Sequence, residues 1–417
     1  MGQMIKICAA MAVVWYGMLA VAAAEPIALK RGINLDIWDS WPGEERWDER
    51  AVLLPFPEWQ RKIKSEDLMV LRQAGFDFVR MPVDPAPFLS PKTEPFRDAL
   101  FLSVERAVDT ITASGLKVVV DLHAIPAGKR SSGSERLAAD PALFDRYVDL
   151  VREFAGILRD RPANQVAFEP MNEPLAGCDG NQATWAQMQK RLFAAARSSA
   201  TRLTLILSGG CWSGAESLAD IDPNSIADDN IIWTFHSYAP FLLTHQGATW
   251  AGDFIRYVSG IPYPPHGENA DERELALEQS RQRIRAEAPA DRRSGMLTYL
   301  DELVAEVDTA GKLSAMMQFP FETVTAWADR HGIDRKNILL GEFGMIRQEY
   351  GTPDVMNPQW RAAYVGDMID LAEKSGFSWS IWGYGGAFGV VEEFDGRRAE
   401  TNILDLVRKL GTVRPSH

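Results

Sequence analysis

Short apolar runs alternate along the chain with longer segments of helical periodicity. The apolar runs are rich in Val, Ile and Leu and do not alternate with polar residues, which is typical of parallel strands buried on both faces. Eight such runs predict eight strands, at residues 32–35, 78–83, 117–122, 166–168, 203–207, 231–235, 338–340 and 377–381. The segments between them predict helices, with clear limits at residues 65–74, 97–114, 142–159 and 360–375. Gly75, Gly115 and Gly376 stand where such helices are expected to end.

Eight strands in alternation with helices predict an α/β fold, a (β/α)8 TIM barrel, as one domain over residues 25–417. A doubly wound open sheet is the alternative, but the chain lacks the G-x-G-x-x-G fingerprint of that fold. The sixth and seventh strands lie about a hundred residues apart, so we expect a long insertion at residues 243–321. Its charged middle, residues 268–293, predicts a solvated helix or a mobile stretch. Two interpretations stay open: the insertion shapes the site, or it never touches the substrate.

The first 24 residues are typical of a cleavable export signal. Lys6 precedes an uncharged run at residues 7–24, and small residues at Ala22 and Ala24 precede a cleavage position before Glu25. An uncleaved membrane anchor is the alternative, but 18 uncharged residues are short for a membrane span. We therefore expect a periplasmic or secreted protein without stable membrane association after cleavage.

The net charge of the chain is −13, from 44 Lys and Arg against 57 Asp and Glu. Such an acidic chain, without a basic block, is a poor candidate for binding nucleic acid. We expect a monomer that acts on a neutral polymer. Cys178 and Cys211 follow the fourth and fifth strands, so their loops meet at one face of a barrel, and we predict a disulfide there; two unpaired thiols are the alternative.

The residues that end the predicted strands carry the candidate chemistry, because the working residues of such barrels lie at the carboxyl ends of the strands. Charged side chains are rarely buried unless they are paired, so packing alone does not explain this set. The residues at these positions are Arg80, His123, Asn172, Glu173, His236, Tyr238, Glu342 and Trp382.

Two carboxylates that face each other across a barrel mouth suit the cleavage of a glycosidic bond. One must be protonated to donate to the leaving oxygen, and the other must be ionised to attack the anomeric carbon. We expect an arginine and a tyrosine hydroxyl to keep one glutamate charged, and crowding by that carboxylate to keep the other protonated.

Seven segments in order resemble glycoside hydrolase family 5, the cellulase-type retaining enzymes of clan A. They are RGINL at Arg31, VRMPV at Val79, VVVDLH at Val118, FEPMNEP at Phe168, TFHSYAP at Thr234, LLGEFG at Leu339 and WSIWGY at Trp379. Each segment falls on its own predicted strand, and together they extend over nearly all of residues 30–410, which makes the match specific.

The resemblance implies a role for each matching position. Glu173 matches the general acid/base and Glu342 the nucleophile, with their carboxyl groups about 5–5.5 Å apart. Asn172 matches the residue that holds the sugar 2-hydroxyl. Arg80 and Tyr238 match the groups that support the nucleophile. His123 and His236 match the histidines that line the cleavage subsite, and Trp382 matches the stacking platform.

We expect no metal and no organic cofactor, and we expect Trp38 and Trp212 to stack on sugars at flanking subsites. The resemblance favours an endo-β-1,4-glucanase, with β-mannan, xyloglucan and β-1,3-glucan as alternative substrates. Two other classes stay open. One is a metal-dependent barrel hydrolase that uses His123, His236 and the glutamates as ligands, and the other is a non-catalytic glycan-binding protein.

Overall fold

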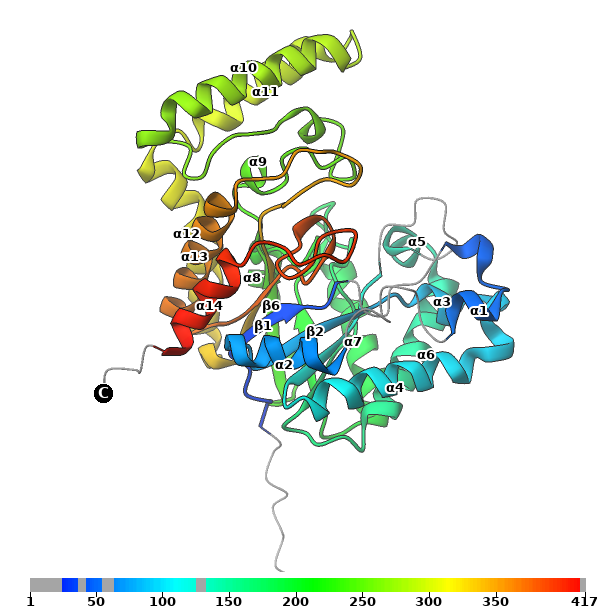
Figure 1. The fold of residues 1–417 in the computed structure, drawn as a ribbon. Helices are drawn as coiled ribbons and strands as arrows, with labels where there is room; N and C mark the ends of the chain where they lie inside the picture. The colour runs from blue at the N-terminus through cyan, green and yellow to red at the C-terminus, as the bar shows by residue number, and fades with distance from the viewer. Residues whose placement is uncertain (1–24, 37–42, 55–63, 125–132, 413–417) are drawn as a thin grey trace, which may run out of the picture.

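Eight parallel strands close into a barrel in the order of the chain, β1 to β8, so the predicted (β/α)8 TIM barrel is confirmed (Figure 1). The computed structural model describes residues 25–36, 43–54, 64–124 and 133–412. The predicted signal at residues 1–24 and Trp38 lie outside these described residues. The strands are β1 (Arg31–Asn34), β2 (Phe78–Val83), β3 (Lys117–Leu122), β4 (Val166–Glu169), β5 (Thr204–Ser208), β6 (Ile231–His236), β7 (Ile338–Phe343) and β8 (Ser378–Ile381).

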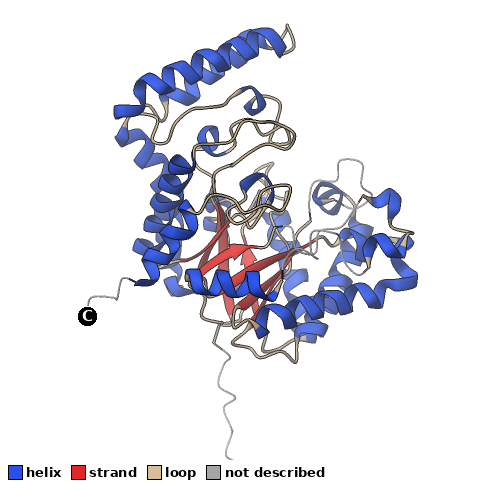
Figure 2. Ribbon diagram, viewed as in Figure 1, coloured by secondary structure: helices blue, strands red, loops and turns tan. Residues whose placement is uncertain are grey.

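Helices surround the barrel on its outer side (Figure 2). The α-helices of the described residues are α1 (Arg50–Leu53), α2 (Ser65–Ala74), α3 (Ala86–Leu89), α4 (Arg97–Ala113), α5 (Ser134–Ala139), α6 (Pro141–Leu158), α7 (Gln182–Ser199), α8 (Ala215–Ala219), α9 (Phe241–Thr244), α10 (Ala270–Glu287), α11 (Arg293–Ala305), α12 (Ala310–His331), α13 (Pro358–Ser375) and α14 (Asn402–Thr412). Among the described residues, no helix has both the length and the apolar character needed to cross a membrane.

Four strands extend further at their carboxyl ends than the apolar runs predicted. β4 continues to Glu169, β5 to Ser208, β6 to His236 and β7 through Glu342 to Phe343. The prediction ended each strand with the last residue of its apolar run. The structure keeps these residues in the strands because the inward face of the barrel changes from apolar to polar near its carboxyl end.

The amino end of the barrel interior is closed by an apolar cluster. Six strands, β2 to β7, contribute one residue each, and the N-terminal segment contributes two. The members are Ile27, Leu29, Phe78, Val119, Ala167, Ile206, Ile232 and Leu339. Two residues further along β2, β3 and β4 stand Arg80, Asp121 and Glu169, all fully buried. Side chains of a strand alternate between its faces, so these charged groups also point into the barrel. They form the next layer above the apolar cluster, on the side of the barrel mouth.

Part of the insertion between β6 and β7 forms a helical hairpin. Helices α10 and α11 pack side by side and extend away from the barrel (Figure 1), and the charged middle is therefore a helix, as one of its two interpretations predicted. The predicted range, residues 243–321, was too long at its end. Residues 310–321 belong to α12, which packs against α8 and α13 as one of the helices around the barrel.

Candidate active site

The guanidinium of Arg80 lies at the centre of the polar layer inside the barrel. Its Nε lies 2.8 Å from Oε2 of Glu169, its Nη2 lies 3.0 Å from Oδ2 of Asp121, and its Nη1 lies 2.7 Å from Oε1 of Glu342. The Arg80 side chain is completely buried. A buried cation is tolerated only when it is paired and hydrogen-bonded, and here three carboxylates surround it.

Two amide side chains complete the contacts of Arg80. Nη1 donates to Oδ1 of Asn34 at 2.9 Å, and Nη2 donates to Oδ1 of Asn172 at 2.7 Å. The amide nitrogen of Asn172 then faces Nε2 of His123 at 3.2 Å. These contacts fix which way the Asn172 amide points, which depends on the hydrogen-bond network.

Arg80 was placed among the residues at the ends of the predicted strands, and this placement was wrong. β2 runs to Val83, as its predicted range does, and Arg80 lies in the middle of the strand, inside the barrel below its mouth. The sequence interpretation also missed Asp121 and Glu169. A signal was present, because each is an acidic residue within an apolar strand, and Asp121 stands two positions before His123 and so on the same face.

Glu342 stands in β7 and accepts a hydrogen bond on each carboxylate oxygen. Oε1 accepts from Arg80, and Oε2 accepts from the hydroxyl of Tyr238 at 3.0 Å. Its side chain is only 5% exposed. Burial, together with the neighbouring Glu342, raises the pKa of Tyr238 well above 10, so this phenol stays protonated and donates.

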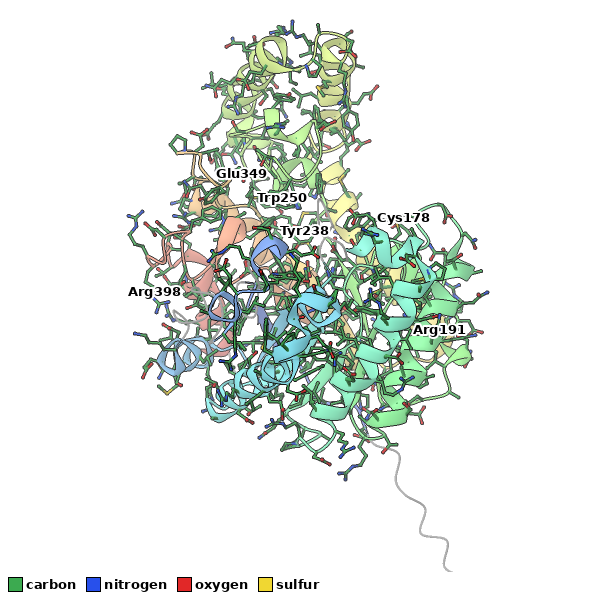
Figure 3. All side chains as sticks on the ribbon, turned by 90° about the vertical axis from the view of Figure 1, so that its right-hand side faces the viewer. Cys178, Arg191, Tyr238, Trp250, Glu349 and Arg398 are labelled. Atoms are coloured by element: carbon green, nitrogen blue, oxygen red, sulfur yellow. A yellow bond between two sulfur atoms is a disulfide. The ribbon has the colours of Figure 1, made fainter. Side chains whose placement is uncertain are left out.

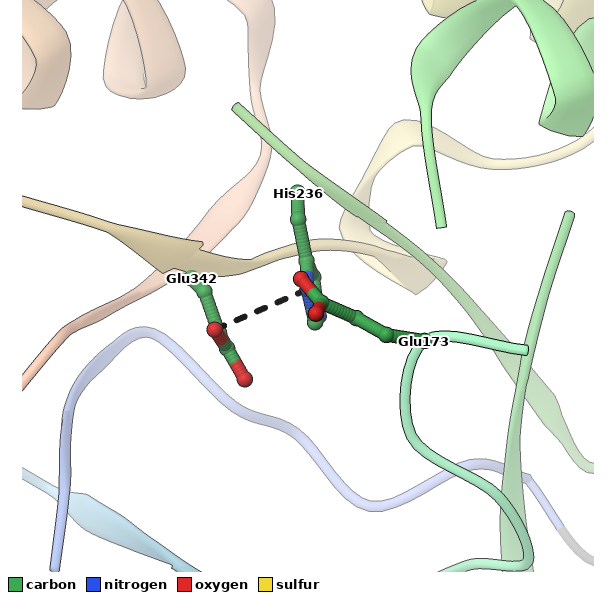
Figure 4. Close-up of side chains that lie close together, drawn as sticks. All are labelled: Glu173, His236 and Glu342. Carbon is green, nitrogen blue, oxygen red and sulfur yellow. Dashed lines mark hydrogen bonds and ion pairs between the residues drawn. The ribbon is translucent and has the colours of Figure 1, made fainter. Parts of the chain in front are cut away.

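Glu173 follows β4 and lies opposite Glu342 at the barrel mouth (Figure 4). Its Oε1 lies 2.8 Å from Nδ1 of His236, whose Nδ1 is also 3.7 Å from Oε2 of Glu342. One carboxylate oxygen of each glutamate and a ring nitrogen of His236 all lie within 4.8 Å of one another. The backbone of Glu173 has a φ of +37°, a value that residues other than glycine rarely adopt.

The two glutamates differ in what surrounds them. Burial raises the pKa of Glu173 to about 7 and also raises the pKa of Glu342. Burial lowers the pKa of His236 to about 4, so the ring beside Glu173 is neutral near neutral pH. Glu342 accepts hydrogen bonds from a cation and a phenol, which favour its charged form, whereas Glu173 meets a neutral imidazole. Of the two, Glu173 is the better place for a proton.

His123 lies between the polar layer and the barrel mouth. Its Nδ1 is 2.8 Å from Oδ2 of Asp121, and its ring stacks on Trp382 with centroids 5.3 Å apart. Burial lowers the pKa of His123. A neutral His123 that donates from Nδ1 to Asp121 leaves Nε2 free to accept from Asn172, so one tautomer satisfies both contacts.

Gly341 leaves room for His236. A Cβ atom at Gly341 would lie 2.8 Å from Nε2 of His236 and 2.6 Å from Oγ1 of Thr234. The ring of His236 therefore fits beside β7 only because this position has no side chain.

The cluster of Glu173, His236 and Glu342 has three donor atoms close enough to hold a metal ion. Both oxygens of Glu342 already accept from Arg80 and Tyr238. A guanidinium at 2.7 Å competes with a second cation at the same carboxylate. The arrangement therefore suits an ionised carboxylate supported by donors better than it suits a metal ligand.

The structure joins Cys178 and Cys211 in a disulfide, as the positions of their loops predicted. Trp212 follows Cys211 and its residue surface is 47% exposed, which suits the predicted stacking on a sugar. Trp38, the other predicted flanking residue, lies outside the described residues.

A group of aromatic rings that the sequence interpretation did not assign lies beside Tyr238. Phe388 contacts Tyr238, His245 and Trp250, with ring centroids 5.7, 5.3 and 6.3 Å apart. His245 and Trp250 belong to the first part of the predicted insertion, and Trp250 is 58% exposed (Figure 3). The start of the insertion therefore contacts a residue that binds Glu342, whereas α10 and α11 extend away from the barrel (Figure 1).

Comparisons with known proteins show the family and the fold. The family model described as cellulase (glycosyl hydrolase family 5) matches residues 50–387. Endoglucanase 3 of Fibrobacter succinogenes is 22% identical over 342 residues, which cover 79% of this chain and 47% of that protein. Endoglucanase C of Acetivibrio thermocellus is 26% identical over 254 residues, which cover 59% of this chain and 68% of that protein. The chain thus spans about half the length of the first relative and two thirds of the second.

Solved structures share the fold. Each of the three matches below covers 91% of this chain. A hyperthermophilic endo-β-1,4-glucanase in complex with substrate is 21% identical, with 97% of that chain covered and a TM-score of 0.61. The cellulose synthase subunit Z of Clostridioides difficile is 21% identical, with 99% of that chain covered and a TM-score of 0.62. Cel5A of Thermotoga maritima in complex with mannotriose is 20% identical, with 97% of that chain covered and a TM-score of 0.62.

Proposed function

Since the chain belongs to glycosyl hydrolase family 5 and is a glycoside hydrolase of the cellulase type, we propose that it cleaves β-1,4-glucan internally with retention of anomeric configuration. One observation carries the proposal: oxygens of Glu173 and Glu342 lie within 4.8 Å across the barrel mouth. Retaining enzymes place their carboxyl groups about 5–5.5 Å apart, and inverting enzymes need about 6.5–9.5 Å to admit a water molecule.

In this mechanism Glu342 is the nucleophile. Its carboxylate attacks the anomeric carbon, the bond to the leaving oxygen breaks, and a covalent glycosyl-enzyme forms. Arg80 and Tyr238 donate to the carboxylate and hold it in one orientation. These donors keep Glu342 ionised before the attack.

Glu173 is the general acid and then the general base. Its raised pKa, about 7, lets it hold a proton near neutral pH and deliver it to the leaving oxygen. The resulting carboxylate then takes a proton from the water that attacks the glycosyl-enzyme. The neutral His236 at 2.8 Å can donate to the charged form of Glu173 or accept from its protonated form, so it supports both states.

The remaining predicted residues hold the sugar. Asn172 accepts from Arg80 through its oxygen, so its amide hydrogens face His123 and the barrel mouth, where a 2-hydroxyl can bind. Trp382 has one ring face against His123, and its other face offers a stacking surface. Trp212 serves a flanking subsite.

β-1,4-Glucan is the proposed substrate because Endoglucanase 3 and Endoglucanase C are among the relatives. β-Mannan is the second candidate, since one structural neighbour is described in complex with mannotriose. Xyloglucan and β-1,3-glucan fit the same chemistry and belong in the same test.

The test measures reducing ends released from carboxymethyl cellulose, mannan, xyloglucan and laminarin by the native protein and by Glu342→Gln. A matched control is Glu216→Gln, which changes an exposed glutamate on α8. We expect release from carboxymethyl cellulose by the native protein and the control, and none by Glu342→Gln. Release only from another polymer replaces the substrate and keeps the mechanism. Binding without release from any substrate supports a non-catalytic glycan-binding protein.

Two further measurements test the mechanism. Proton NMR of a cellobioside reaction should show the β-anomer first, and an initial α-anomer contradicts retention. Activity that is lost in a chelator and restored by a divalent cation contradicts the proposal and supports the metal-dependent alternative.

The proposal includes export of the protein by its N-terminal segment to the periplasm or the medium, where it acts as a monomer. A disulfide at Cys178 and Cys211 suits an oxidising compartment and supports this location. N-terminal sequencing of the exported protein tests it, with Glu25 expected as the first residue.

A further inference from the structure

Two loops at the carboxyl end of the barrel are joined along their length. The segment after β4, residues 173–178, runs beside the segment after β5, residues 210–213. The backbone N–H of Cys211 donates to the carbonyl of Ala176 at 3.0 Å, and that of Trp212 donates to the carbonyl of Pro174 at 3.1 Å. The Cys178–Cys211 disulfide closes the same contact at its outer end.

The close approach of these loops depends on Gly210. A Cβ atom at Gly210 would lie 2.4 Å from the carbonyl oxygen of Ala176. Any larger side chain there would push the second loop away from the first. The two loops are therefore fitted to each other and do not merely lie near each other.

Three consecutive residues of the second loop have a left-handed backbone. The φ angles of Cys211, Trp212 and Ser213 are +42°, +62° and +54°. Residues with a Cβ atom adopt this conformation at a cost in free energy, and they do so usually one at a time. Such a turn persists only where the surrounding structure fixes it. Residues 211–213 are held by hydrogen bonds to the loop at 173–178, by the disulfide and by the hydrogen bond from His236 to Ser213.

This left-handed turn is bonded to Pro174, the residue after the proposed acid/base Glu173, and to His236. Its neighbour loop begins with Glu173, whose own φ is +37°. On the other side, the backbone N–H of His236 donates to the carbonyl of Ser213 at 2.9 Å, and Nδ1 of His236 lies 2.8 Å from Oε1 of Glu173. A shift of the turn therefore moves Glu173 and His236 relative to each other.

We propose that the Cys178–Cys211 disulfide is a positioning element for the general acid/base: it holds the left-handed turn at residues 211–213 that fixes Glu173 against His236. The inference rests on the proposed role of Glu173 as acid/base. A disulfide that only stabilised the fold would leave proton donation unaffected in the molecules that remain folded.

The test compares two aryl cellobiosides on the native enzyme and on the double variant Cys178→Ser with Cys211→Ser. A dinitrophenyl leaving group departs without a proton, whereas a phenyl leaving group needs one. We expect kcat/KM for the phenyl substrate to fall about 10- to 100-fold in the double variant, because proton donation is sensitive to placement. For the dinitrophenyl substrate we expect a change of less than about threefold. Equal losses on both substrates, or no loss on either, overturn the proposal.

Glu173→Ala, measured in parallel, separates this inference from the proposed function. The acid/base role requires a large loss on the phenyl substrate and a small loss in the glycosylation step of the dinitrophenyl substrate. Without that contrast in Glu173→Ala, the proposed function fails. If Glu173→Ala shows the contrast and the double cysteine variant does not, only the role of the disulfide fails.

Two additions extend the test, and the first of them does not require the double variant to fold. The native enzyme can be treated with dithiothreitol, which becomes a cyclic disulfide as Cys178 and Cys211 each gain an electron and a proton; Cys178 is exposed to it. The folded, reduced enzyme should show the same contrast between substrates. In the double-variant background, Ser213→Gly should recover part of the phenyl activity, because glycine adopts positive φ freely, and Ser213→Ala should not. Recovery by neither variant contradicts the role of the turn.

Discussion

Arg80 and Glu342 form an ion pair inside the barrel, with Nη1 of the arginine 2.7 Å from Oε1 of the glutamate and both side chains at most 5% exposed. The same guanidinium is bonded to Asp121 and Glu169. The proposed nucleophile is thus one member of a group of three carboxylates that share a cation. Its charge and orientation depend on how completely Arg80 satisfies the group.

Arg80→Lys should therefore weaken catalysis without removing the charge. Arg80 reaches acceptors on five residues from a planar fork, and it binds both oxygens of Glu169, through Nε at 2.8 Å and Nη2 at 3.0 Å. A lysine ammonium cannot do this, so Glu342 loses a donor or Glu169 loses its two-point contact. We expect kcat to fall about 10²- to 10³-fold, as for loss of one preorganised donor at a reacting centre. The measurement is steady-state kinetics on an aryl cellobioside with Arg408→Lys, an exposed change on α14, as the control. A kcat within threefold of native would show that one point charge is sufficient.

The pH profile should have an alkaline limb set by Glu173. Burial raises the pKa of Glu173 to about 7, and the acid form is needed to protonate the leaving group. The active form is thus lost as pH rises through about 7, so kcat/KM on a phenyl cellobioside should decline above neutrality. The check is the same profile on Asp121→Asn, because burial also raises the pKa of Asp121 to about 7. A limb that disappears in Asp121→Asn assigns it to Asp121 and contradicts the prediction.

The sequence predicts the barrel and its rim well, since both follow from short-range patterns. Strands buried on both faces leave continuous apolar runs, and β2 and β3 begin and end at the predicted residues. The rim residues, such as Glu173 and Glu342, follow those runs in the chain and resemble a known family. Their proximity in the structure is a consequence of barrel closure, which brings six strand ends to one mouth.

The layer around Arg80 was harder to predict because it depends on contacts between strands far apart in the chain. Asp121 and Glu169 are neighbours in the register of β3 and β4, and two adjacent buried carboxylates make sense only with the cation between them. No local pattern reports that pairing. An acidic residue in an apolar strand is the available signal, and it indicates a partner without identifying it.

The left-handed turn gave no sequence signal at all. Positive φ is normally inferred from glycine, yet the three residues of the turn are Cys211, Trp212 and Ser213. The turn is hydrogen-bonded to the loop that contains Glu173, more than thirty residues away in the chain, and no local pattern reports such a tertiary contact. The predicted end of the insertion was wrong for a similar reason. Where the barrel resumes is shown by the packing of α12 on α8 and α13, which is a tertiary contact.

The disulfide should contribute measurably to stability. It closes a loop with a sequence separation of 33 residues, and a crosslink of this size typically adds about 2–4 kcal/mol to the free energy of unfolding. We expect the Cys178→Ser, Cys211→Ser variant to lose this amount in urea denaturation. Thiol titration of the exported protein, denatured without reductant and after removal of the signal that holds Cys8, should find no free thiol. Two free thiols would contradict the disulfide itself.

Asp121 should make the protein less stable as pH rises from about 4 to about 7. Burial raises the pKa of Asp121 to about 7 despite the opposing effect of Arg80, whereas the unfolded chain has the ordinary value near 3.8. Between these values the unfolded chain has released the proton and the folded protein still holds it. The folded state therefore binds more protons, and its stability is full below about pH 4 and falls until the folded pKa is passed. The raised pKa values of Glu169, Glu173 and Glu342 act with the same sign.

Asp121→Asn removes one of these groups and should reduce the slope of unfolding free energy against pH. The slope between pH 5 and pH 6.5 should become shallower by at most about 1.4 kcal/mol per pH unit through Asp121 itself, the value for one proton. The slope is the readout because the substitution also changes the contacts to Arg80 and His123, which shifts the unfolding free energy at every pH. The charge of Asp121 also raises the pKa of Glu169 and Glu173, so its removal makes the slope shallower through them as well. An unchanged slope would mean that Asp121 is already ionised at pH 5, held in that form by the ion pair at 3.0 Å. Three carboxylates share the single charge of Arg80, so the proton that relieves their repulsion would then lie on Glu169 or Glu342. The same experiment on Glu169→Gln would identify which of the two holds it.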